Sequence, residues 1–116
     1  MTDLLNKTEQ EILLKIAREA LEKSVRGLAL PDVNLPVLSP ALQADGASFV
    51  TLTIEGRLRG CIGTLEPYQP LAKDVQEHAV AAALHDPRFP NVQPEETDSI
   101  KIEVSVPGGV ELALKT

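Results

Sequence analysis

The strongest pattern in the sequence is an apolar stripe near the N-terminus. Between residues 8 and 25, apolar side chains recur three and four positions apart, which places them on one side of a helix. The stripe consists of Ile12, Leu13, Ile16, Ala17, Ala20, Leu21 and Val25. Thr8 and Glu11 have the spacing of a capping box at the start of this helix, and Gly27 suits a left-handed cap after its end. The pattern predicts one amphipathic helix over residues 8–25.

Two later segments alternate apolar and polar residues, as half-buried strands do. Residues 47–54 and residues 99–106 both follow this period of two. The inward positions are Val50, Leu52 and Ile54 in the first segment and Ile100, Ile102, Val104 and Val106 in the second. Glu55-Gly56 is typical of a tight turn, so residues 57–65 are expected to return beside the first strand as a hairpin.

A second helix and a long connector complete the expected elements. Pro70 suits the first turn of a helix, and Pro87 disfavours helical geometry at the residue before it. We therefore expect a helix from residue 70 to about residue 84. Residues 28–46 contain three prolines and no periodic pattern, which predicts an extended connector without regular structure. Residues 107–116 receive no assignment.

The order of these elements defines the expected fold class. A helix, a connector, a hairpin, a helix and a strand form an α/β (α+β) arrangement in which helices pack on a small mixed or antiparallel sheet. With 116 residues and an apolar content of 43%, the chain fits a single domain over residues 1–116. Because aromatic residues make up only 3% of the chain, its core must consist mainly of aliphatic side chains.

Charge and cysteine content argue against several kinds of function. A net charge of -6 without any basic block disfavours nucleic-acid binding, which depends on clustered Lys and Arg. The single cysteine, Cys61, cannot form an internal disulfide, and no apolar run is long enough for a membrane span or a secretory signal. We therefore expect a cytoplasmic protein. The sequence has no phosphate loop, dinucleotide fingerprint or zinc-finger spacing, so neither a cofactor nor a bound metal is expected.

A heptapeptide in the second strand of the predicted hairpin resembles the signature of a known family. Residues 58–64 read LRGCIGT, which is similar to the signature heptapeptide of the AMMECR family. The segment GASFVTL before it, the alanine-rich helix after it, and the later segments DPRFP and IEVSV fit that family in unbroken order. By this resemblance, about residues 9–106 are identified as an AMMECR-like domain.

The resemblance implies a fold and a class of partner, but no reaction. AMMECR proteins have a main sheet flanked by helices, and the molecular function of the family is unresolved. In some prokaryotes they are encoded or fused with Memo-type and radical-SAM-type proteins, which implies a protein partner of one of these types. Family domains continue well beyond the position that matches Val106, so we expect a C-terminally shortened chain with a divergent tail at residues 107–116. Apolar surface exposed by the missing part would favour a homo-oligomer.

Cys61 is the main candidate for chemistry. A thiol becomes nucleophilic when positive charge or aligned backbone N–H groups stabilise its thiolate. In a regular strand, Arg59 would share a face with Cys61. Gly60 and Gly63 could open the backbone so that its amides bind an oxyanion, and Thr64 is a further candidate for binding. The alternative is that Cys61 is a small buried apolar residue of the strand.

The segment after the second predicted helix supplies the remaining candidates. His85 is a candidate general base if the fold brings it within reach of Cys61. Asp86 and Arg88 could form an ion pair or bind an anion. The alternative is that Asp86 caps the turn and Arg88 is anchored locally. His78 is expected to be a partly exposed residue of the helix.

Two functions from different classes follow from these residues. In the first, the chain is a cysteine-dependent enzyme or enzyme subunit that acts on a small anionic substrate through Cys61, Arg59 and His85. In the second, it is an adaptor that binds a Memo-type or radical-SAM-type protein through the glycine-bearing strand and the connector. The candidate residues favour the enzyme, and the adaptor stays open as the alternative.

Overall fold

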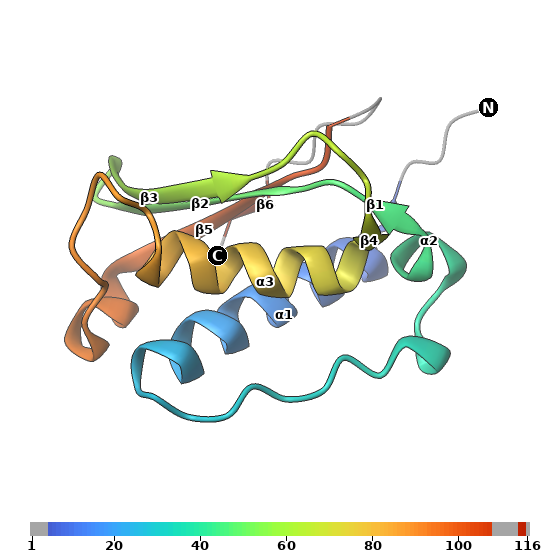
Figure 1. Ribbon diagram of the computed structural model, residues 1–116, viewed down its shortest axis with the longest axis horizontal. Coiled ribbons are helices and arrows are strands. Elements are labelled where there is room, and N and C mark those ends of the chain that lie inside the picture. Colours follow the sequence, from blue (N-terminus) through green and yellow to red (C-terminus); the bar gives the residue numbers. More distant parts are fainter. Residues whose placement is uncertain (1–4, 108–113, 116) are drawn as a thin grey trace.

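A four-stranded antiparallel sheet with two long helices on one face forms the body of the protein (Figure 1). The computed structural model describes residues 5–107, 114 and 115. The long helices are α1 (Lys7–Val25) and α3 (Leu71–Leu84), and the strands, in spatial order, are β3 (Arg57–Gly63), β2 (Phe49–Ile54), β5 (Ile100–Ser105) and β6 (Leu114–Lys115). A small second sheet pairs β1 (Asp45–Gly46) with β4 (Gln69–Pro70). The expected α/β (α+β) class is confirmed, and no helix in the described part has the length and hydropathy needed to cross a membrane.

The first helix has a different N-terminal cap from the one predicted. Asn6 Oδ1 accepts the backbone N–H of Glu9 at 2.7 Å, and Glu9 Oε1 accepts the backbone N–H of Asn6 at 2.8 Å. The capping box predicted from Thr8 and Glu11 is therefore wrong, and Thr8 lies inside the helix. Both pairs are three residues apart, so spacing alone does not distinguish them. At the other end, Gly27 has φ +72°, as expected of a left-handed cap.

The expectation of an unstructured connector over residues 28–46 is wrong. The connector contains the short helical turns η1 (Leu35–Val37) and α2 (Pro40–Gln43). Each has a proline in its first turn, where the fixed φ suits a helix and no backbone N–H is needed. Leu42 is fully buried, so the connector contributes to the core. The 3₁₀ helix η2 (Pro94–Ser99) begins in the same way before β5.

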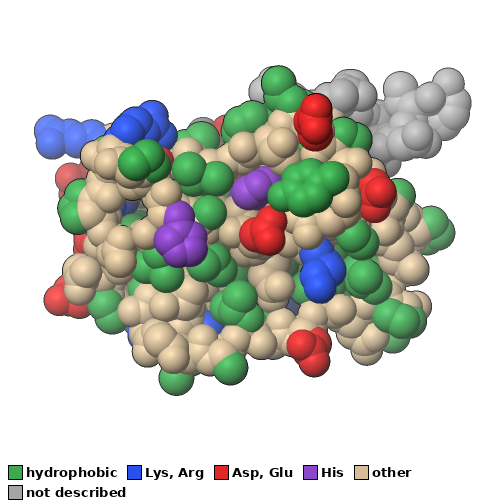
Figure 2. Space-filling view, in the orientation of Figure 1, with side chains coloured by type: hydrophobic (Ala, Val, Ile, Leu, Met, Phe, Trp, Pro, Cys, Tyr) green, Lys and Arg blue, Asp and Glu red, His purple; other side chains and the backbone are tan. Residues whose placement is uncertain are grey.

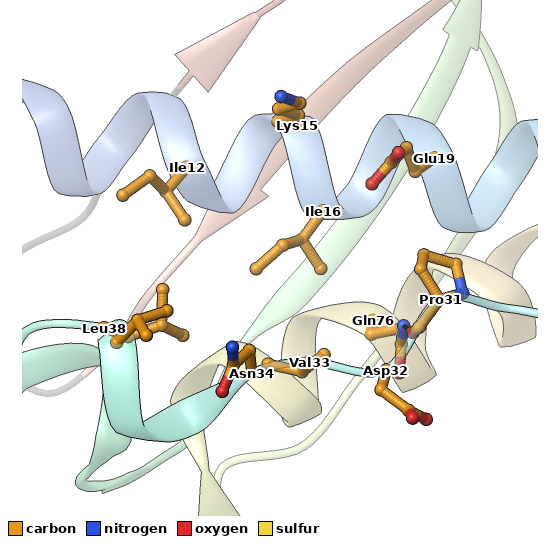
Figure 3. A pocket seen from close by; sticks show the side chains of 11 residues that line it. Ile12, Lys15, Ile16, Glu19, Pro31, Asp32, Val33, Asn34, Leu38 and Gln76 are labelled. Carbon is orange, nitrogen blue, oxygen red and sulfur yellow. Dashed lines mark hydrogen bonds between the residues drawn. The ribbon is translucent and has the colours of Figure 1, made fainter.

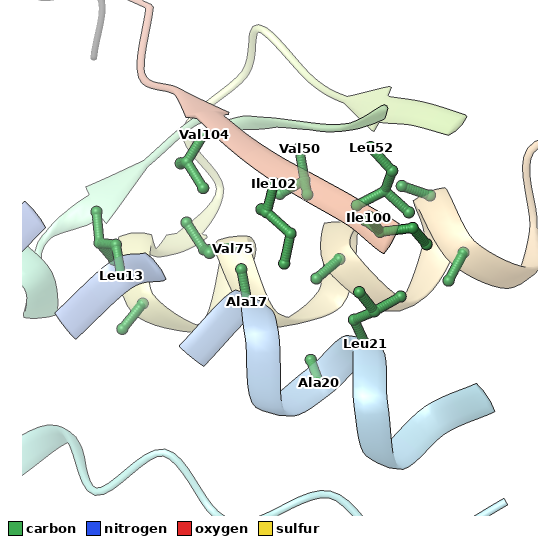
Figure 4. Close-up of a cluster of buried hydrophobic side chains, with 14 of the residues drawn as sticks. Leu13, Ala17, Ala20, Leu21, Val50, Leu52, Val75, Ile100, Ile102 and Val104 are labelled. Carbon is green, nitrogen blue, oxygen red and sulfur yellow. The ribbon is translucent and has the colours of Figure 1, made fainter. Parts of the chain in front are cut away.

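The core lies between the sheet and the two long helices, and it is aliphatic as expected (Figure 4). It includes Leu13, Ala17, Ala20 and Leu21 of α1, Ala72, Val75, Ala79, Ala82 and Ala83 of α3, Val50 and Leu52 of β2, and Ile100, Ile102 and Val104 of β5. The predicted inward positions of both strands are therefore buried, except Ile54 and Val106, which are partly buried. The small side chains of α3 allow this helix to pack closely on its neighbours.

The predicted hairpin is formed by β2 and β3. Glu55 and Gly56 have positive φ values of 51° and 78°, as the two central residues of a type I′ hairpin turn require. Strand β2 begins at Phe49 and strand β3 ends at Gly63, so each is two residues shorter than predicted.

An irregularity in this hairpin lies at Arg59. Leu52 of β2 is paired with Gly60, whereas the next residue, Thr53, is paired with Leu58. Arg59 is thus the extra residue of a β-bulge, which changes the direction of its side chain relative to a regular strand.

Helix α3 contacts strand β3 at a position where a side chain would not fit. A Cβ placed on Gly60 would lie 2.2 Å from the carbonyl oxygen of Ala82 in α3. A contact that short would force the helix and the strand apart. Gly60 therefore marks a close approach of the two main chains, as glycines inside strands often do.

Gly60→Ala should lower the free energy of unfolding by about 2–3 kcal/mol, because the added methyl group overpacks the contact with α3. Gly27→Ala is the control. Nothing lies within 4 Å of the Cβ that it adds, so only the left-handed backbone costs stability, by about 1 kcal/mol. Urea denaturation followed by circular dichroism measures both variants. Equal losses would contradict the packing argument.

Candidate functional site

Cys61 lies on the face of the sheet that points away from the helices. It is paired with Thr51 of β2, whose neighbours along the strand, Val50 and Leu52, are buried on the helix side. Because successive strand residues point to opposite faces, Thr51 and Cys61 point outward. The Cys61 Sγ lies 3.2 Å from the Thr51 Oγ1, and the cysteine is partly buried. The thiol is thus neither sealed in the core nor fully exposed.

Asp86 connects the backbone of Cys61 to the guanidinium of Arg88. The Cys61 N–H donates to Asp86 Oδ2 at 3.0 Å. Arg88 donates to the same carboxylate from Nε to Oδ1 at 3.0 Å and from Nη2 to Oδ2 at 2.8 Å. The Arg88 backbone N–H donates to Oδ1 at 3.0 Å as well. The two interpretations offered for this segment are therefore compatible: the ion pair is present, and Asp86 also caps the turn.

These contacts keep Asp86 ionised although it is only 5% exposed. The hydrogen bonds from Arg88 hold the pKa of Asp86 well below its usual range, with help from the Cys61 N–H, and they outweigh burial, which acts in the opposite direction. Asp86 in turn raises the pKa of Arg88.

The guanidinium of Arg88 is oriented but accessible. Its side chain is 56% exposed, and its carbon Cζ lies 5.4 Å from the centre of the Phe89 ring. Nη2 also reaches the carbonyl oxygen of Cys61 at 3.4 Å. In the described part of the chain, Nη1 has no hydrogen bond. Arg88 therefore presents a charged donor group to solvent beside Cys61.

Arg59 does not serve Cys61 in the way the sequence suggested. Its Nε donates to Glu96 Oε2 at 3.0 Å and its Nη2 to Oε1 at 2.9 Å, and this pairing lowers the pKa of Glu96. Its Nη1 donates to the carbonyl of Pro90 at 2.9 Å, and Nη2 also donates to that of Asn91 at 3.2 Å. The side chain is only 14% exposed. The β-bulge thus directs Arg59 to the loop before η2, where it has a structural role.

The glycines of the motif provide space rather than oxyanion donors. Gly60 packs on α3, and a Cβ on Gly63 would lie 2.4 Å from both the Phe49 ring and the carbonyl oxygen of Ser48. The N–H of Cys61 itself already donates to Asp86. An oxyanion site at these amides, as expected from the sequence, therefore has no support in the geometry.

Thr64 and His85 also have local surroundings. The Thr64 hydroxyl accepts the backbone N–H of Glu66 at 3.1 Å, which is an ordinary turn contact. His85 is exposed at the C-terminal end of α3. Within the described residues, no hydrogen bond joins its imidazole to Cys61 or to another group. The structure thus brings Cys61, Asp86 and Arg88 together, while Arg59, Thr64 and His85 have other environments.

A second polar cluster, which the sequence did not single out, surrounds Asp74 in α3. Ser48 Oγ donates to Asp74 Oδ2 at 2.7 Å, His78 Nδ1 lies 3.1 Å from the same oxygen, and Gln69 Nε2 donates to Oδ1 at 3.0 Å. Ser48 and Asp74 are fully buried and His78 is 6% exposed, so the expectation of a partly exposed His78 is wrong. With Glu77, these residues form what we call the Asp74 cluster, in which Asp74, Glu77 and His78 could hold a metal ion. Their spacing on one helix face is the signal that could have identified it.

A groove of about 360 Å³ lies between α1 and the connector, away from both polar groups (Figure 3). Its apolar lining includes Ile12, Ile16, Val33 and Leu38. None of the residues predicted as site residues lines it.

Comparison with known proteins links the chain to one family. The AMMECR1 family model matches residues 14–115. A protein of Methanothermobacter thermautotrophicus is 49% identical over 105 residues, covering 88% of this chain and 53% of that protein. A protein of Aeropyrum pernix is 40% identical, covering 92% of this chain and 47% of its own length. The crystal structure of an uncharacterised protein from Pyrococcus horikoshii has a TM-score of 0.74 and 36% identity, covering 83% of this chain and 49% of that one. The chain therefore spans about half the length of these relatives.

Asp86→Asn should lower the free energy of unfolding near neutral pH by about 2 kcal/mol, because a charged hydrogen-bond acceptor is lost. A carboxyl group whose pKa is lower in the folded state stabilises the fold above its unfolded pKa, about 3.9, and this contribution is lost as the pH falls through the folded-state value. The difference between the wild type and Asp86→Asn should thus be constant down to about pH 4 and shrink below it.

Urea denaturation over a series of pH values measures this difference. Asp98→Asn is the matched control, because Asp98 is exposed and its side chain has no hydrogen bond among the described residues. It should change stability by less than about 0.5 kcal/mol at every pH. A loss for Asp86→Asn that does not shrink in acid would contradict the assigned ion pair.

Proposed function

The chain belongs to the AMMECR1 family, and on this premise we propose that it is a protein-binding module that docks a partner on the helix-free face of its sheet. The proposed partner is a protein of Memo or radical-SAM type, as the family resemblance implies, met in the cytoplasm. The face consists of the outward side chains of three strands, Phe49, Thr51, Thr53, Cys61, Lys101, Glu103 and Ser105, and we call it the open sheet face.

The observation that carries this proposal is the one-sided arrangement of the layers. Both long helices lie on one side of the sheet, and no described helix lies on the other (Figure 1). The side chains of the open sheet face are partly buried or exposed, and Arg88 stands beside it with an unbonded Nη1. Oriented arginines of this kind are frequent at the centres of protein interfaces.

The contacts around Cys61 support binding more than catalysis. A cysteine enzyme needs a base or a cation near the sulfur and free donors for an oxyanion. Here Arg59 is paired with Glu96, His85 has no hydrogen bond to Cys61, and the Cys61 N–H is used by Asp86. What the motif provides is a rigid strand with a fixed guanidinium beside it.

A second candidate function rests on the accessibility of the thiol. Cys61 is partly exposed, and the Arg88 guanidinium donates to its carbonyl oxygen. A small anionic substrate could therefore meet a cation and a thiol at one place. This is the cysteine-dependent enzyme of the sequence analysis, with Arg88 in the role first given to Arg59.

Arg88→Glu should weaken binding of the partner at least about tenfold, because the charge beside the open sheet face is reversed. Cys61→Ser should leave the affinity unchanged within about twofold, since the thiol is not needed for docking. Purified Memo-type and radical-SAM-type proteins from the genome that encodes the chain are titrated by calorimetry. Lys7→Glu makes the same charge change on α1 and serves as the control, with no effect on binding.

Absence of binding to both proteins would contradict the adaptor proposal. So would an equal loss in Arg88→Glu and Lys7→Glu, because it would reflect net charge instead of a defined surface. Analytical ultracentrifugation of the chain alone provides a third test. If Arg88→Glu abolishes self-association and no partner binds, the open sheet face joins two copies of the chain and the adaptor proposal fails.

For the enzyme candidate, iodoacetamide should alkylate Cys61 at neutral pH faster than it alkylates N-acetylcysteine, because a guanidinium beside a thiol favours attack by the sulfur. Mass spectrometry of the intact protein follows the reaction. Arg88→Gln should slow the alkylation, whereas Arg57→Gln, an exposed change at the start of the same strand, should not. A rate below that of the free amino acid derivative would remove the nucleophile.

A further inference from the structure

Asp74 is a buried carboxylate without a lysine or arginine beside it in the described part of the chain. It is fully inaccessible to solvent. A buried carboxylate is costly unless several polar groups compensate it. Among the described residues, Ser48 and Gln69 donate to Asp74, and the imidazole of His78 lies against it.

The imidazole of His78 faces Asp74 through its Nδ1. This nitrogen lies 3.1 Å from Asp74 Oδ2, within hydrogen-bond distance. The same nitrogen lies 3.3 Å from Ser48 Oγ, which donates its own proton to Asp74. His78 Nδ1 thus faces Asp74 Oδ2, and a cation could bind to both atoms.

We propose that Asp74, Glu77 and His78 bind one divalent transition-metal ion of the Zn²⁺ type. The three residues occupy positions i, i+3 and i+4 of α3, and their ligand atoms lie within 4.8 Å of one another. Two carboxylate oxygens and one imidazole nitrogen are a donor set that Zn²⁺ uses with a water as the fourth ligand. The site lies apart from Cys61, so the inference does not rest on the proposed function.

The distances fit this ion after a small movement of one side chain. Ligands about 2.0–2.2 Å from Zn²⁺ in a tetrahedron are roughly 3.3–3.6 Å from each other. Asp74 Oδ2 and His78 Nδ1, at 3.1 Å, lie within a few tenths of an ångström of this separation. Glu77 is exposed, and in the described part its Oε2 has no hydrogen bond, so its carboxylate can turn toward the other two. Where Nδ1 carries a proton, the ion displaces it to Nε2 or to solvent.

The surroundings already orient the ligands. Gln69 Nε2 donates to Asp74 Oδ1 and, at 2.9 Å, to Glu77 Oε1. The hydroxyl of Tyr68 donates to the same Glu77 oxygen at 3.1 Å. Such outer contacts fix ligand carboxylates in metal sites. Glu77 is exposed, so a water ligand can approach the cluster from its side. Figure 2 shows acidic and histidine side chains on this face of the molecule.

The test is calorimetric titration of the full chain with ZnCl₂ in a Cys61→Ser background, which removes the thiol as a competing ligand. One ion per chain is expected, with a raised thermal midpoint. Glu77→Gln should weaken the affinity by at least about 10–100-fold. Because Glu77 is exposed, this variant is expected to fold normally, which circular dichroism verifies. His78→Ala should abolish binding, whereas His85→Ala, which changes the other histidine of the chain, should bind like the parent.

Two further readouts make the result decisive. Co²⁺ should give visible ligand-field absorption in the parent that is absent in Glu77→Gln, and Mg²⁺ should bind far more weakly because imidazole is a poor ligand for it. No heat with Zn²⁺ would overturn the proposal. Unchanged affinity in Glu77→Gln, or loss of binding in His85→Ala, would do the same, since the ion would then lie elsewhere.

Discussion

The contact of Gly60 in β3 with the main chain of Ala82 in α3 is a constraint from which much of the structure follows. The carbonyl oxygen of Ala82 lies only 2.2 Å from the point where any residue other than glycine at position 60 would carry its Cβ. Helix α3 therefore ends directly against the strand, and the turn after it emerges beside the same edge. This is how Asp86, only four residues beyond Ala82, reaches the N–H of Cys61. The position of the polar group beside the motif is thus a consequence of backbone packing.

Two buried carboxylates beside this framework are stabilised by different means. Asp86 has a bidentate arginine and a strand N–H, so its charge is compensated within the chain and its pKa is low. Asp74 has a hydroxyl, an amide and an imidazole. The first arrangement is complete and holds a segment in place. The second contains no guanidinium and includes an imidazole nitrogen that can bind a metal, and this difference separates a structural carboxylate from a candidate ligand.

Local periodicity was sufficient to predict both long helices and three of the strands to within about two residues. The reason is that each pattern depends only on residues within a single helix or strand. The cap at Asn6 was missed since two pairs with capping-box spacing lie side by side. The larger errors concern contacts between elements. Nothing local indicates that Arg59 pairs with Glu96, 37 residues away, or that a β-bulge turns its side chain from Cys61. In the same way, nothing local indicates that His78 is buried and lies 3.3 Å from Ser48, 30 residues earlier in the chain.

The partners of Cys61 also determine how β3 can associate with other chains. Among the described strands, β3 is at the margin of the sheet, and its outward main-chain groups could in principle pair with an incoming extended peptide. At Cys61, however, the N–H is taken by Asp86 and the carbonyl is approached by Arg88. The turn formed by Asp86, Pro87 and Arg88 therefore hinders the addition of another strand at Cys61. A chain that pairs through its backbone with this margin at Cys61 must first displace both contacts, which makes the margin less accessible to strand addition.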